Sequence, residues 1–505
     1  MNSANRIIIN TGAQYIKAII NICLSLYSTR LILDALDIRD FGIYSVVAGV
    51  VGILGYLTNA LVVTTQRYLS YYHGAKNIEY VKKIFANSLF LHIFISLLFG
   101  IILLSLEYIL INKFLNIEHT RLNAAGYVYF ITVFMLIITL ITTPFKALLI
   151  ANENIVYISV VEICDGFLKL ALALTLMNIC YDKLIFYSFG MFIILIIDFS
   201  AYTVYCFTKY QESRINIHTN PIDINCIKQI TGFASWTTFG MLAGVCQIQG
   251  VAIVINKFFG TTMNAAFGIS QQVNGAVRFV STSIINAMNP QIMKAEGNGD
   301  RYEMLNLAGK ESKFSSALMI LISVPIMIEM NDILAFWLKE VPEYSVMFCR
   351  AIMIAFIIDQ LTLGLHAANQ ATGRIETYTI LTTIPKILIV PIMWMVLKCG
   401  FPIYIAMLFY IGIEFVVAAF RIPYMKISAG LNISKYIKNV ILPLIPLCIA
   451  TSCICLLFVY KFDFKYRFFL SSICSVGFGI IAIWFFTLTK TERNYIKYLI
   501  NSKMK

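Results

Sequence analysis

Two stretches of this sequence share one pattern, because residues 39–47 read RDFGIYSVV and residues 265–273 read AAFGISQQV. Phe, Gly and Ile stand at the same three places in both stretches, and each stretch ends in Val. A turn rich in Asn, Asp and Gly follows each of them, HGAKNIEYVKK from His73 and EGNGDRYEMLN from Glu296. The pairing indicates that a segment of the chain occurs twice.

Two further pairs of segments keep nearly the same separation along the chain. ALLIANENIVY at 147–157 matches AANQATGRIET at 367–377, and NTGAQY at 10–15 matches ITGFAS at 230–235. Each match is weak by itself. Because four of them follow in the same order, the sequence predicts two copies of one structural unit.

The composition indicates a membrane protein. Of the 505 residues, 59% are hydrophobic and 13% are charged, and the mean hydropathy is +0.79. Soluble domains are nearer to half apolar and a quarter charged. We count fourteen stretches long enough to cross a hydrocarbon core of about 30 Å. They lie near 7–33, 40–64, 84–107, 124–149, 155–178, 184–208, 230–255, 265–290, 314–338, 344–369, 377–398, 401–424, 437–460 and 467–488.

These stretches predict an all-α polytopic fold, because helices satisfy their own backbone in lipid. Six spans precede a polar linker, so each repeat returns the chain to the same side and the repeats are parallel. The expected division is an N-terminal six-helix bundle at 1–208, a cytoplasmic linker at 209–229, a C-terminal six-helix bundle at 230–425, and two additional helices with a basic tail at 426–505.

The net charge of +13 is explained by topology. Lys and Arg concentrate in alternate loops, which places both termini in the cytoplasm and makes a nucleic-acid partner unnecessary. The first apolar run contains Lys17 and no A-x-A site follows it, so it is expected to stay as a span. The twelve Cys and five His form no metal or redox spacing, and we expect neither a metal nor a cofactor.

The first span carries a polar stripe. Gln14, Lys17 and Asn21 recur at three- and four-residue steps, so they share one helical face, and Arg30 follows near the outer end. Such a stripe either joins helices as a polar seam or presents a functional cation. Because a seam does not need an ammonium, we favour the functional role for Lys17.

The eighth span repeats this pattern at 268–291, which reads GISQQVNGAVRFVSTSIINAMNPQ. Gln271, Asn274 and Arg278 share a face, and Arg278 lies near the middle of the span opposite Gly52 of the first repeat. A charge at mid-membrane costs about 2.5–3.5 kcal/mol on insertion scales, so it must face protein or water. The alternative to a ligand-binding role is an ion pair of Arg278 with Asp359 or Glu414.

Other intramembrane charges leave more than one interpretation open. Glu162, Asp165 and Lys169 lie within two turns of one helix, where they form either a self-satisfied cluster or a proton or sodium site. Asp359 is a further candidate for ion coupling, and it is also a candidate partner for Lys386 on the next helix. No spacing of nucleophile, base or metal ligands suggests an enzyme.

On these repeats, the fourteen spans and the FG segment that opens the second helix of each half, the chain resembles the multidrug/oligosaccharidyl-lipid/polysaccharide (MOP) exporter superfamily. Within it the chain is similar to O-antigen flippases of the Wzx type. The resemblance implies two six-helix bundles around a central cavity that the first two helices of each half line. Lys17 and Arg278 would then face each other across that cavity. The expected lining is Gln14, Lys17, Asn21, Arg30, Lys169, Gln271, Asn274, Arg278 and Lys386.

The resemblance also implies a function. A monomeric transporter of the bacterial cytoplasmic membrane would move undecaprenyl-pyrophosphate-linked oligosaccharide for surface polysaccharide or O-antigen synthesis, with the polysaccharide polymerase machinery and membrane lipid as partners. A cationic cavity suits the pyrophosphate, and amides suit sugar hydroxyls. The alternatives are a cation-coupled multidrug antiporter, which usually has a carboxylate in helix 1, and a lipid II flippase, which usually has several arginines in its first two helices. A polymerase would need a larger external loop.

Overall fold

The computed structural model describes residues 3–52, 54–114, 117–214, 222–338, 340–462, 464, 466–494 and 497, and the regular elements in this part of the chain are all helices. It divides into two compact units. The first unit is Met1–Thr238 with Met293–Gly299, and the second is Phe239–Ile292 with Asp300–Lys505.

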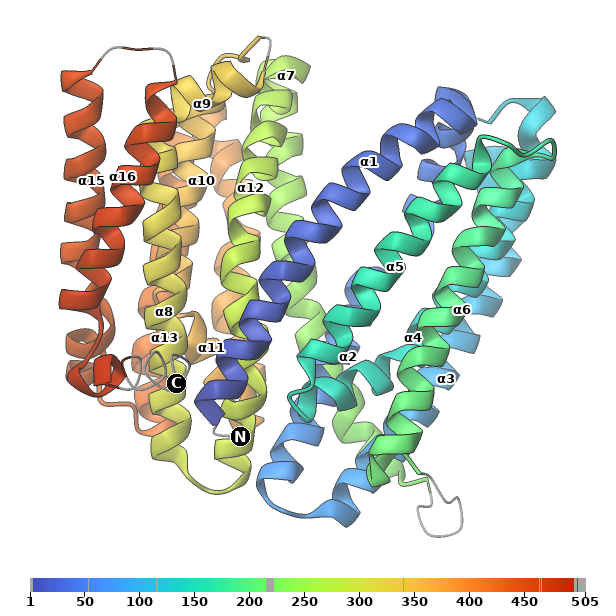
Figure 1. Ribbon diagram of the computed structural model, residues 1–505, viewed down its shortest axis with the longest axis horizontal. Helices are drawn as coiled ribbons and strands as arrows, with labels where there is room; N and C mark the ends of the chain where they lie inside the picture. Colours follow the sequence, from blue (N-terminus) through green and yellow to red (C-terminus); the bar gives the residue numbers. More distant parts are fainter. Residues whose placement is uncertain are drawn as a thin grey trace. The chain divides into compact units, whose positions relative to one another are not determined.

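The first unit is a bundle of long helices (Figure 1). Its elements are α1 (Ser3–Gly52), α2 (Gly55–Gly74), α3 (Ile78–Ile109), η1 (Leu110–Phe114), η2 (His119–Arg121), α4 (Leu122–Ala151), α5 (Ile155–Leu176), α6 (Lys183–Lys209) and η3 (Gln211–Ser213). Most of the buried residues of its core come from α1 and α4, and α2, α3, α5 and α6 add others. The outward face of α3 exposes large apolar side chains, as a lipid-facing helix does, among them Phe94, Leu97 and Ile101.

The second unit contains most of α7 and all the helices that follow it (Figure 1). The elements are α7 (Ile224–Gly297), α8 (Arg301–Ile328), α9 (Met330–Trp337), α10 (Ser345–Gln360), α11 (Leu363–Thr372), α12 (Glu376–Lys398), α13 (Ile403–Ala429), α14 (Ile433–Tyr436), η4 (Ile437–Ile441), α15 (Leu444–Lys461), α16 (Arg467–Ala482) and η5 (Ile483–Thr487).

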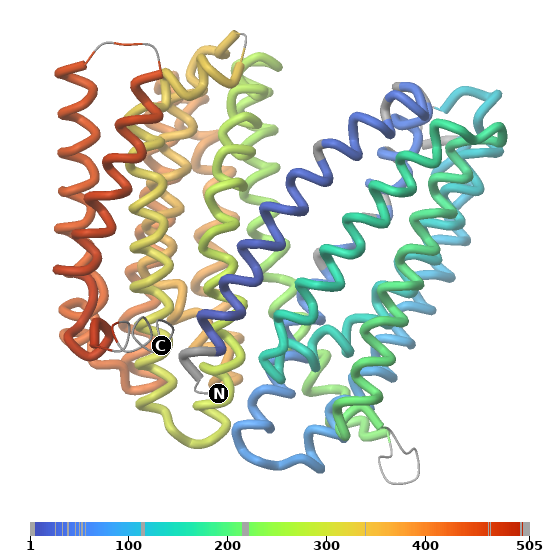
Figure 2. The backbone as a smooth tube through the Cα atoms, viewed as in Figure 1, coloured from blue at the N-terminus to red at the C-terminus, as the bar shows by residue number. Residues whose placement is uncertain are grey.

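Two of the helices are longer than one membrane crossing because each consists of two segments joined at a kink. The backbone leaves the helical region at Asp37 in α1 and at Gly260 in α7, and both residues have positive φ. Each kink lies a few residues before the FG pair of its repeat. Figure 2 shows the bend in α1 as a change in the direction of the blue tube. The repeated sequence pattern therefore corresponds to a repeated helix–kink–helix structure.

The described residues contain ten helices that are long and apolar enough to cross a membrane, and the bent pair α10–α11 makes an eleventh. That count takes α7 as one helix although it has two segments. It also leaves out α5, which carries three charged residues, and the segment 38–74. With these added, about fourteen helical segments correspond to the fourteen predicted spans. The chain is a multi-pass, all-α membrane protein, as the sequence predicts.

Equivalent positions of the two repeats have equivalent local structure. Asn77 caps α3 and Asp300 caps α8, each by accepting a hydrogen bond from the backbone N–H three residues later. The two caps are as far apart along the chain as the two kinks are. Glu153 and Gly373, which occupy the same place in the matched segments 147–157 and 367–377, both adopt a left-handed conformation. Such a φ is strained for a side chain other than Gly and persists where surrounding contacts hold it.

Those contacts are visible around Glu153. Its carboxylate accepts a hydrogen bond from Lys294 Nζ at 2.5 Å and lies 3.8 Å from Arg6 Nη1, and its backbone carbonyl accepts from Asn10 Nδ2 at 2.8 Å. The carboxylate is 7% exposed. Glu153 therefore ties the end of α7 and the start of α1 to the turn between α4 and α5.

The ends of α2 and α7 pack against each other reciprocally within the first unit. A Cβ at Gly74 would lie 2.0 Å from the carbonyl oxygen of Lys294, and a Cβ at Gly297 would lie 1.9 Å from that of Tyr71. Gly74 and Gly297 are equivalent positions of the two repeats, as are Tyr71 and Lys294, because each pair keeps the separation of the caps Asn77 and Asp300. The glycine of each helix end therefore packs against the same position of the other helix end, as in an interface between two symmetric copies.

The helix α8 is the central element of the second unit. In its most apolar stretch, 67% of the residues are buried, which is the largest share among the candidate membrane spans. Because α8 faces protein rather than lipid, it tolerates many serines, including Ser312, Ser315 and Ser316.

The two helices beyond the repeats pack directly on α8. Gly479 of α16 lets Leu321 and Thr451 approach closely. Arg467 binds Glu329 and Asp332 at one end, and Lys313 of α8 binds Glu492 at the other, at 2.7 Å. The helices α15 and α16 are thus fixed parts of the second unit. The predicted division of the chain stays a prediction, and residues 215–221 of its linker lie outside the described residues.

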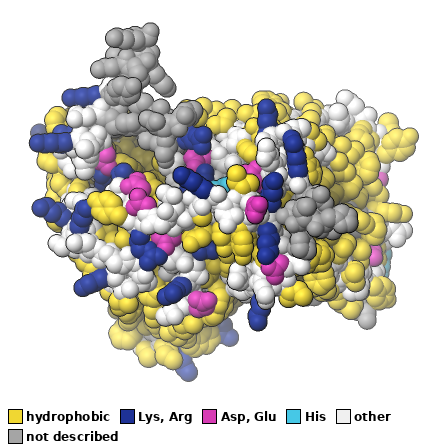
Figure 3. Space-filling model, turned by 90° about the horizontal axis from the view of Figure 1, so that it is seen from below, with side chains coloured by type: hydrophobic (Ala, Val, Ile, Leu, Met, Phe, Trp, Pro, Cys, Tyr) yellow, Lys and Arg dark blue, Asp and Glu magenta, His cyan; other side chains and the backbone are white. Residues whose placement is uncertain are grey.

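Basic side chains are frequent at one end of the helices. Figure 3 views this end and shows many Lys and Arg side chains among the hydrophobic ones. Lys76, in the turn between α2 and α3, is one of the exposed residues. A face with this composition is typical of the membrane–cytoplasm boundary.

We expect Gly74→Ala to lower the free energy of unfolding of the purified protein by about 1–3 kcal/mol, and with it the melting temperature. The added methyl group would clash with the backbone of Lys294, which a change of side-chain rotamer cannot relieve. Gly268→Ala is the matched control, since a Cβ there meets nothing within 4 Å, and it should leave the melting temperature unchanged or raise it slightly. Thermal unfolding in detergent measures both. Equal stability of the two variants would contradict the reciprocal packing.

Candidate functional site

The polar stripe of α1 faces α5. Lys17 Nζ lies 2.8 Å from Glu162 Oε2 and donates a hydrogen bond to Gln14 Oε1 at 3.1 Å. Asn21 Nδ2 donates to the backbone carbonyl of Glu162 at 3.3 Å. The shared face that the spacing predicts is present, and its three side chains meet around one acidic residue.

Glu162 also accepts a hydrogen bond from a second lysine. Lys146 Nζ of α4 lies 3.2 Å from Glu162 Oε1. Lys169, which we considered together with Glu162 and Asp165, pairs directly with Asp165 one turn away, at 2.7 Å. The carboxylate of Glu162 is 30% exposed, so the pairing with two ammonium groups takes place in a partly solvated site.

A third carboxylate completes this group. Asp198 of α6 lies close enough to Asp165 for the two acids to repel each other. The groups that meet here, called the Glu162 cluster, are Lys17, Lys146, Glu162, Asp165, Lys169 and Asp198. With every group ionised the cluster is neutral, because three lysines balance three acids.

Arg30 does not join this cluster. It is exposed on α1, about 20 Å along the axis from Lys17. The structure thus separates the two cations of the first helix: Lys17 has an acidic partner, and Arg30 forms no ion pair with a described residue.

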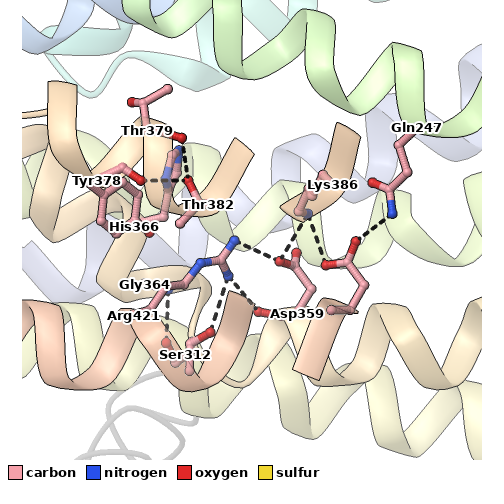
Figure 4. Close-up of polar contacts among 12 residues, drawn as sticks. Gln247, Ser312, Asp359, Gly364, His366, Tyr378, Thr379, Thr382, Lys386 and Arg421 are labelled. Carbon is pink, nitrogen blue, oxygen red and sulfur yellow. Dashed lines mark hydrogen bonds and ion pairs between the residues drawn. The ribbon is translucent and has the colours of Figure 1, made fainter. Parts of the chain in front are cut away.

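In the second unit, polar side chains from several helices converge on two acids (Figure 4). Glu414 of α13 lies 3.0 Å from Lys386 Nζ and accepts a hydrogen bond from Gln247 Nε2 at 3.0 Å. Asp359 of α10 lies 2.9 Å from Arg421 Nη2 and 3.9 Å from Lys386 Nζ. We call these five residues the Asp359 network. The pairing of Asp359 with Lys386, one of the two roles considered for Asp359, is present.

Arg421 also holds a broken backbone. The chain bends by 44° between α10 and α11. Arg421 Nη1 donates to the carbonyl of Asp359 and to Thr362 Oγ1, both at 3.2 Å. The guanidinium therefore adds two hydrogen bonds at the break between the two helices, where the Asp359 carbonyl also accepts one from the backbone N–H of Thr362.

Arg278 lies near this network without joining it. Its side chain is exposed, and its guanidinium lies over the ring of Phe356 at 5.4 Å. It is near enough to Asp359 for the charges to attract. The alternative role considered for Arg278, an ion pair with Asp359 or Glu414, is absent among the described residues, because Lys386 and Arg421 hold these acids.

The amides beside Arg278 also have free capacity. Gln271 Nε2 and Asn274 Oδ1 are buried atoms without a hydrogen-bond partner in the described part of the chain. One turn beyond Arg278, Ser281 donates to Gln360 and attaches this segment of α7 to the end of α10. A charged group and two amides thus lie on one anchored helix face.

The sequence did not identify every member of these clusters. The sequence pattern singled out neither Lys146 nor Arg421, and Gln247 shares its apolar run with another amide, Gln249. For Lys146 and Arg421 a signal exists, since each lies within two residues of a helix proline, Pro144 and Pro423. For Gln247 we find none. Among the described residues no group of three His, Cys, Asp or Glu side chains is placed to hold a metal ion.

The chain was compared with known proteins. No protein-family model matches it. No curated protein matches it either. Solved structures do match: one is the outward-facing conformation of a multidrug resistance MATE family transporter of the MOP superfamily, with a TM-score of 0.73 and 12% identity over 86% of this chain and 97% of that chain.

Two more structures show the same likeness. One is a MOP superfamily transporter from Pyrococcus furiosus whose reverse polarity of the binding pocket suggests a different function, with a TM-score of 0.72, 12% identity and the same coverage, 86% and 97%. The other is a MATE protein in the straight conformation, with a TM-score of 0.72, 12% identity and again 86% and 97% coverage. This chain therefore has the fold of the MATE transporters of the MOP superfamily.

Proposed function

We propose that the protein is a transporter that moves an anionic lipid-linked oligosaccharide across the bacterial cytoplasmic membrane by alternating access. The substrate class is an undecaprenyl-pyrophosphate-linked repeat unit for surface polysaccharide or O-antigen synthesis. Both termini lie in the cytoplasm, and the protein acts as a monomer beside the polysaccharide polymerase machinery. The transporter fold supports the general activity, and the charges support the substrate class.

The observation that carries the proposal is the isolation of Arg278. Asp359 and Glu414 are neutralised by Lys386 and Arg421, so the charge of Arg278 is not needed to balance an acid of its own unit. An exposed guanidinium in an apolar span needs a counter-charge from elsewhere. A pyrophosphate supplies that charge and accepts paired hydrogen bonds from arginine.

The neighbouring amides suit the sugar part of the substrate. Gln271 Nε2 is a free donor and Asn274 Oδ1 is a free acceptor on the same helix as Arg278. Sugar hydroxyls both donate and accept hydrogen bonds, so they match such a mixed set. The role of Arg30, as an exposed cation at the outer end of α1, would be to attract the same anion.

Energy coupling would use the Glu162 cluster. Asp165 and Asp198 are neighbouring carboxylates, and such a pair shares a proton or holds a sodium ion more readily than an isolated acid. Asp359 was an alternative candidate. Its contacts with Arg421 and Lys386 favour a structural role there.

A cation-coupled multidrug antiporter is the second candidate. A multidrug resistance transporter is among the similar structures, and the three acids of the Glu162 cluster are the feature of this chain that suits it. Helix α1 itself contributes Lys17 to that cluster rather than an acid, which favours the anionic substrate. A lipid II flippase would use the same cations and differs in the glycan carried.

Deleting the gene should leave lipid-linked oligosaccharide on the cytoplasmic face and remove the surface polysaccharide, because the pyrophosphate does not cross the membrane unaided. Glycosidase-accessible glycan in inverted and right-side-out vesicles measures its sidedness. Normal sidedness together with increased sensitivity to cationic drugs would support the antiporter instead.

Arg278→Ala should reduce polysaccharide export by about 10- to 100-fold, since a hydrogen bond to a charged group contributes about 1.5–3 kcal/mol. Arg278→Lys should keep part of the activity if charge dominates and lose it if paired hydrogen bonds dominate. Lys257→Ala is the matched control, because Lys257 is an exposed cation on the same helix and lies 5.9 Å from the ring of Trp394. Export by Arg278→Ala equal to that of the control would contradict the assignment.

Lys17→Ala should also abolish export while the protein still inserts into the membrane. The loss of export could have either of two causes, because Lys17 either binds substrate or only neutralises Glu162, and a double variant separates them. If it binds substrate, the double variant Lys17→Ala/Glu162→Gln stays inactive; if it only neutralises, the double variant recovers. Export and protein level, measured together for both single variants and the double variant, decide between them.

A further inference from the structure

The Asp359 network contains an ammonium group placed between two acids. Lys386 Nζ lies 3.0 Å from Glu414 Oε2 and 3.9 Å from Asp359 Oδ1, and it reaches them from α12 while the acids belong to α13 and α10 (Figure 4). The side chains are largely buried, with exposures of 21% for Lys386, 7% for Glu414 and 15% for Asp359. Two carboxylates in such surroundings require a cation between them.

The two cations of this network differ in what they contact. Arg421 binds a carboxylate and also a backbone carbonyl and a hydroxyl at the break between α10 and α11, so its planar, many-donor head is needed there. The contacts of Lys386 among the described residues are with the two carboxylates. Its role is therefore that of a compact positive charge.

The acidic groups beside Lys386 Nζ are of a kind that a monovalent metal ion also binds. Carboxylate and amide oxygens are the ligands that hard cations prefer. Two carboxylates flank the ammonium, and Gln247 Nε2 donates a hydrogen bond to Glu414 Oε1, which holds that carboxylate in place. Lys386 follows Pro385 in α12, so its ammonium is attached to the protein, whereas a metal ion would have to come from solution.

We propose that the space between Asp359 and Glu414 is a monovalent-cation site whose cation is the ammonium of Lys386. The second unit thus carries its counter-ion covalently and does not take one from solution. This inference goes beyond the proposed function, because it concerns the ion chemistry of one unit and does not depend on which substrate is carried. Removing the ammonium should turn a self-filled site into one that binds Na⁺.

The test is the thermal stability of purified protein in NaCl and in choline chloride at equal ionic strength. The wild-type protein should melt at the same temperature in both salts. Lys386→Ala should melt lower than wild type in choline chloride and should recover in a saturable way as Na⁺ replaces choline, because a ligand that binds only the folded state raises its stability. Direct binding of radioactive Na⁺ should rise from background in the wild type to saturation in the variant.

Two controls separate a site from a general salt effect. Lys386→Ala/Glu414→Gln removes one of the carboxylates and should lose both the sodium-specific recovery and the Na⁺ binding. Lys257→Ala removes an exposed lysine from the same unit and should respond to the two salts as the wild type does. If Lys386→Ala does not survive purification, Lys386→Gln takes its place, since it keeps a polar side chain while removing the charge.

A folded Lys386→Ala or Lys386→Gln protein without any sodium-specific response would overturn the proposal. So would a saturable Na⁺ response of the wild type that Asp359→Asn abolishes, because the site would then already bind a free ion. Either result leaves the role of Arg278 in export untouched, since that role is measured by polysaccharide export.

Discussion

Charge compensation inside each helical unit is the constraint on which the rest of this structure depends. An ionised side chain between apolar helices is stable only when an opposite charge or a set of hydrogen bonds meets it there. The first unit satisfies this rule with the three lysines and three acids of the Glu162 cluster, and the second satisfies it with two acids held by Lys386 and Arg421. Both groups join helices that are distant in the sequence.

The same constraint makes the exceptions informative. Arg30 and Arg278 are exposed cations that pair with no acid among the described residues. The guanidinium of Arg278 lies over the ring of Phe356 instead of beside an acid. The ring attracts the guanidinium but does not neutralise its charge. Asp359 and Glu414 already pair with Lys386 and Arg421, so the charge of Arg278 remains available for the anionic substrate that we propose.

Duplication explains the framework, and departures from it explain the specialised features. The kinks at Asp37 and Gly260, the caps Asn77 and Asp300, and the reciprocal packing at Gly74 and Gly297 are shared by the two repeats. Glu153 departs from the pattern in residue type, because it adopts with a side chain the left-handed conformation that Gly373 adopts in the other repeat. Its strain is offset by its ion pairs with Lys294 and Arg6, which join the two repeats' helix ends.

The sequence by itself determined the helical class, about fourteen segments, the repeat and the shared face of Gln14, Lys17 and Asn21, because hydropathy and helical periodicity are local properties. It also identified most of the intramembrane charges as a set. Which acid each lysine meets was decided only by the tertiary structure. Lys17 of α1 and Lys146 of α4 share Glu162 of α5, and Arg421 of α13 reaches the break between α10 and α11. Partner choice depends on how helices pack, and the spacing along one helix does not contain that information.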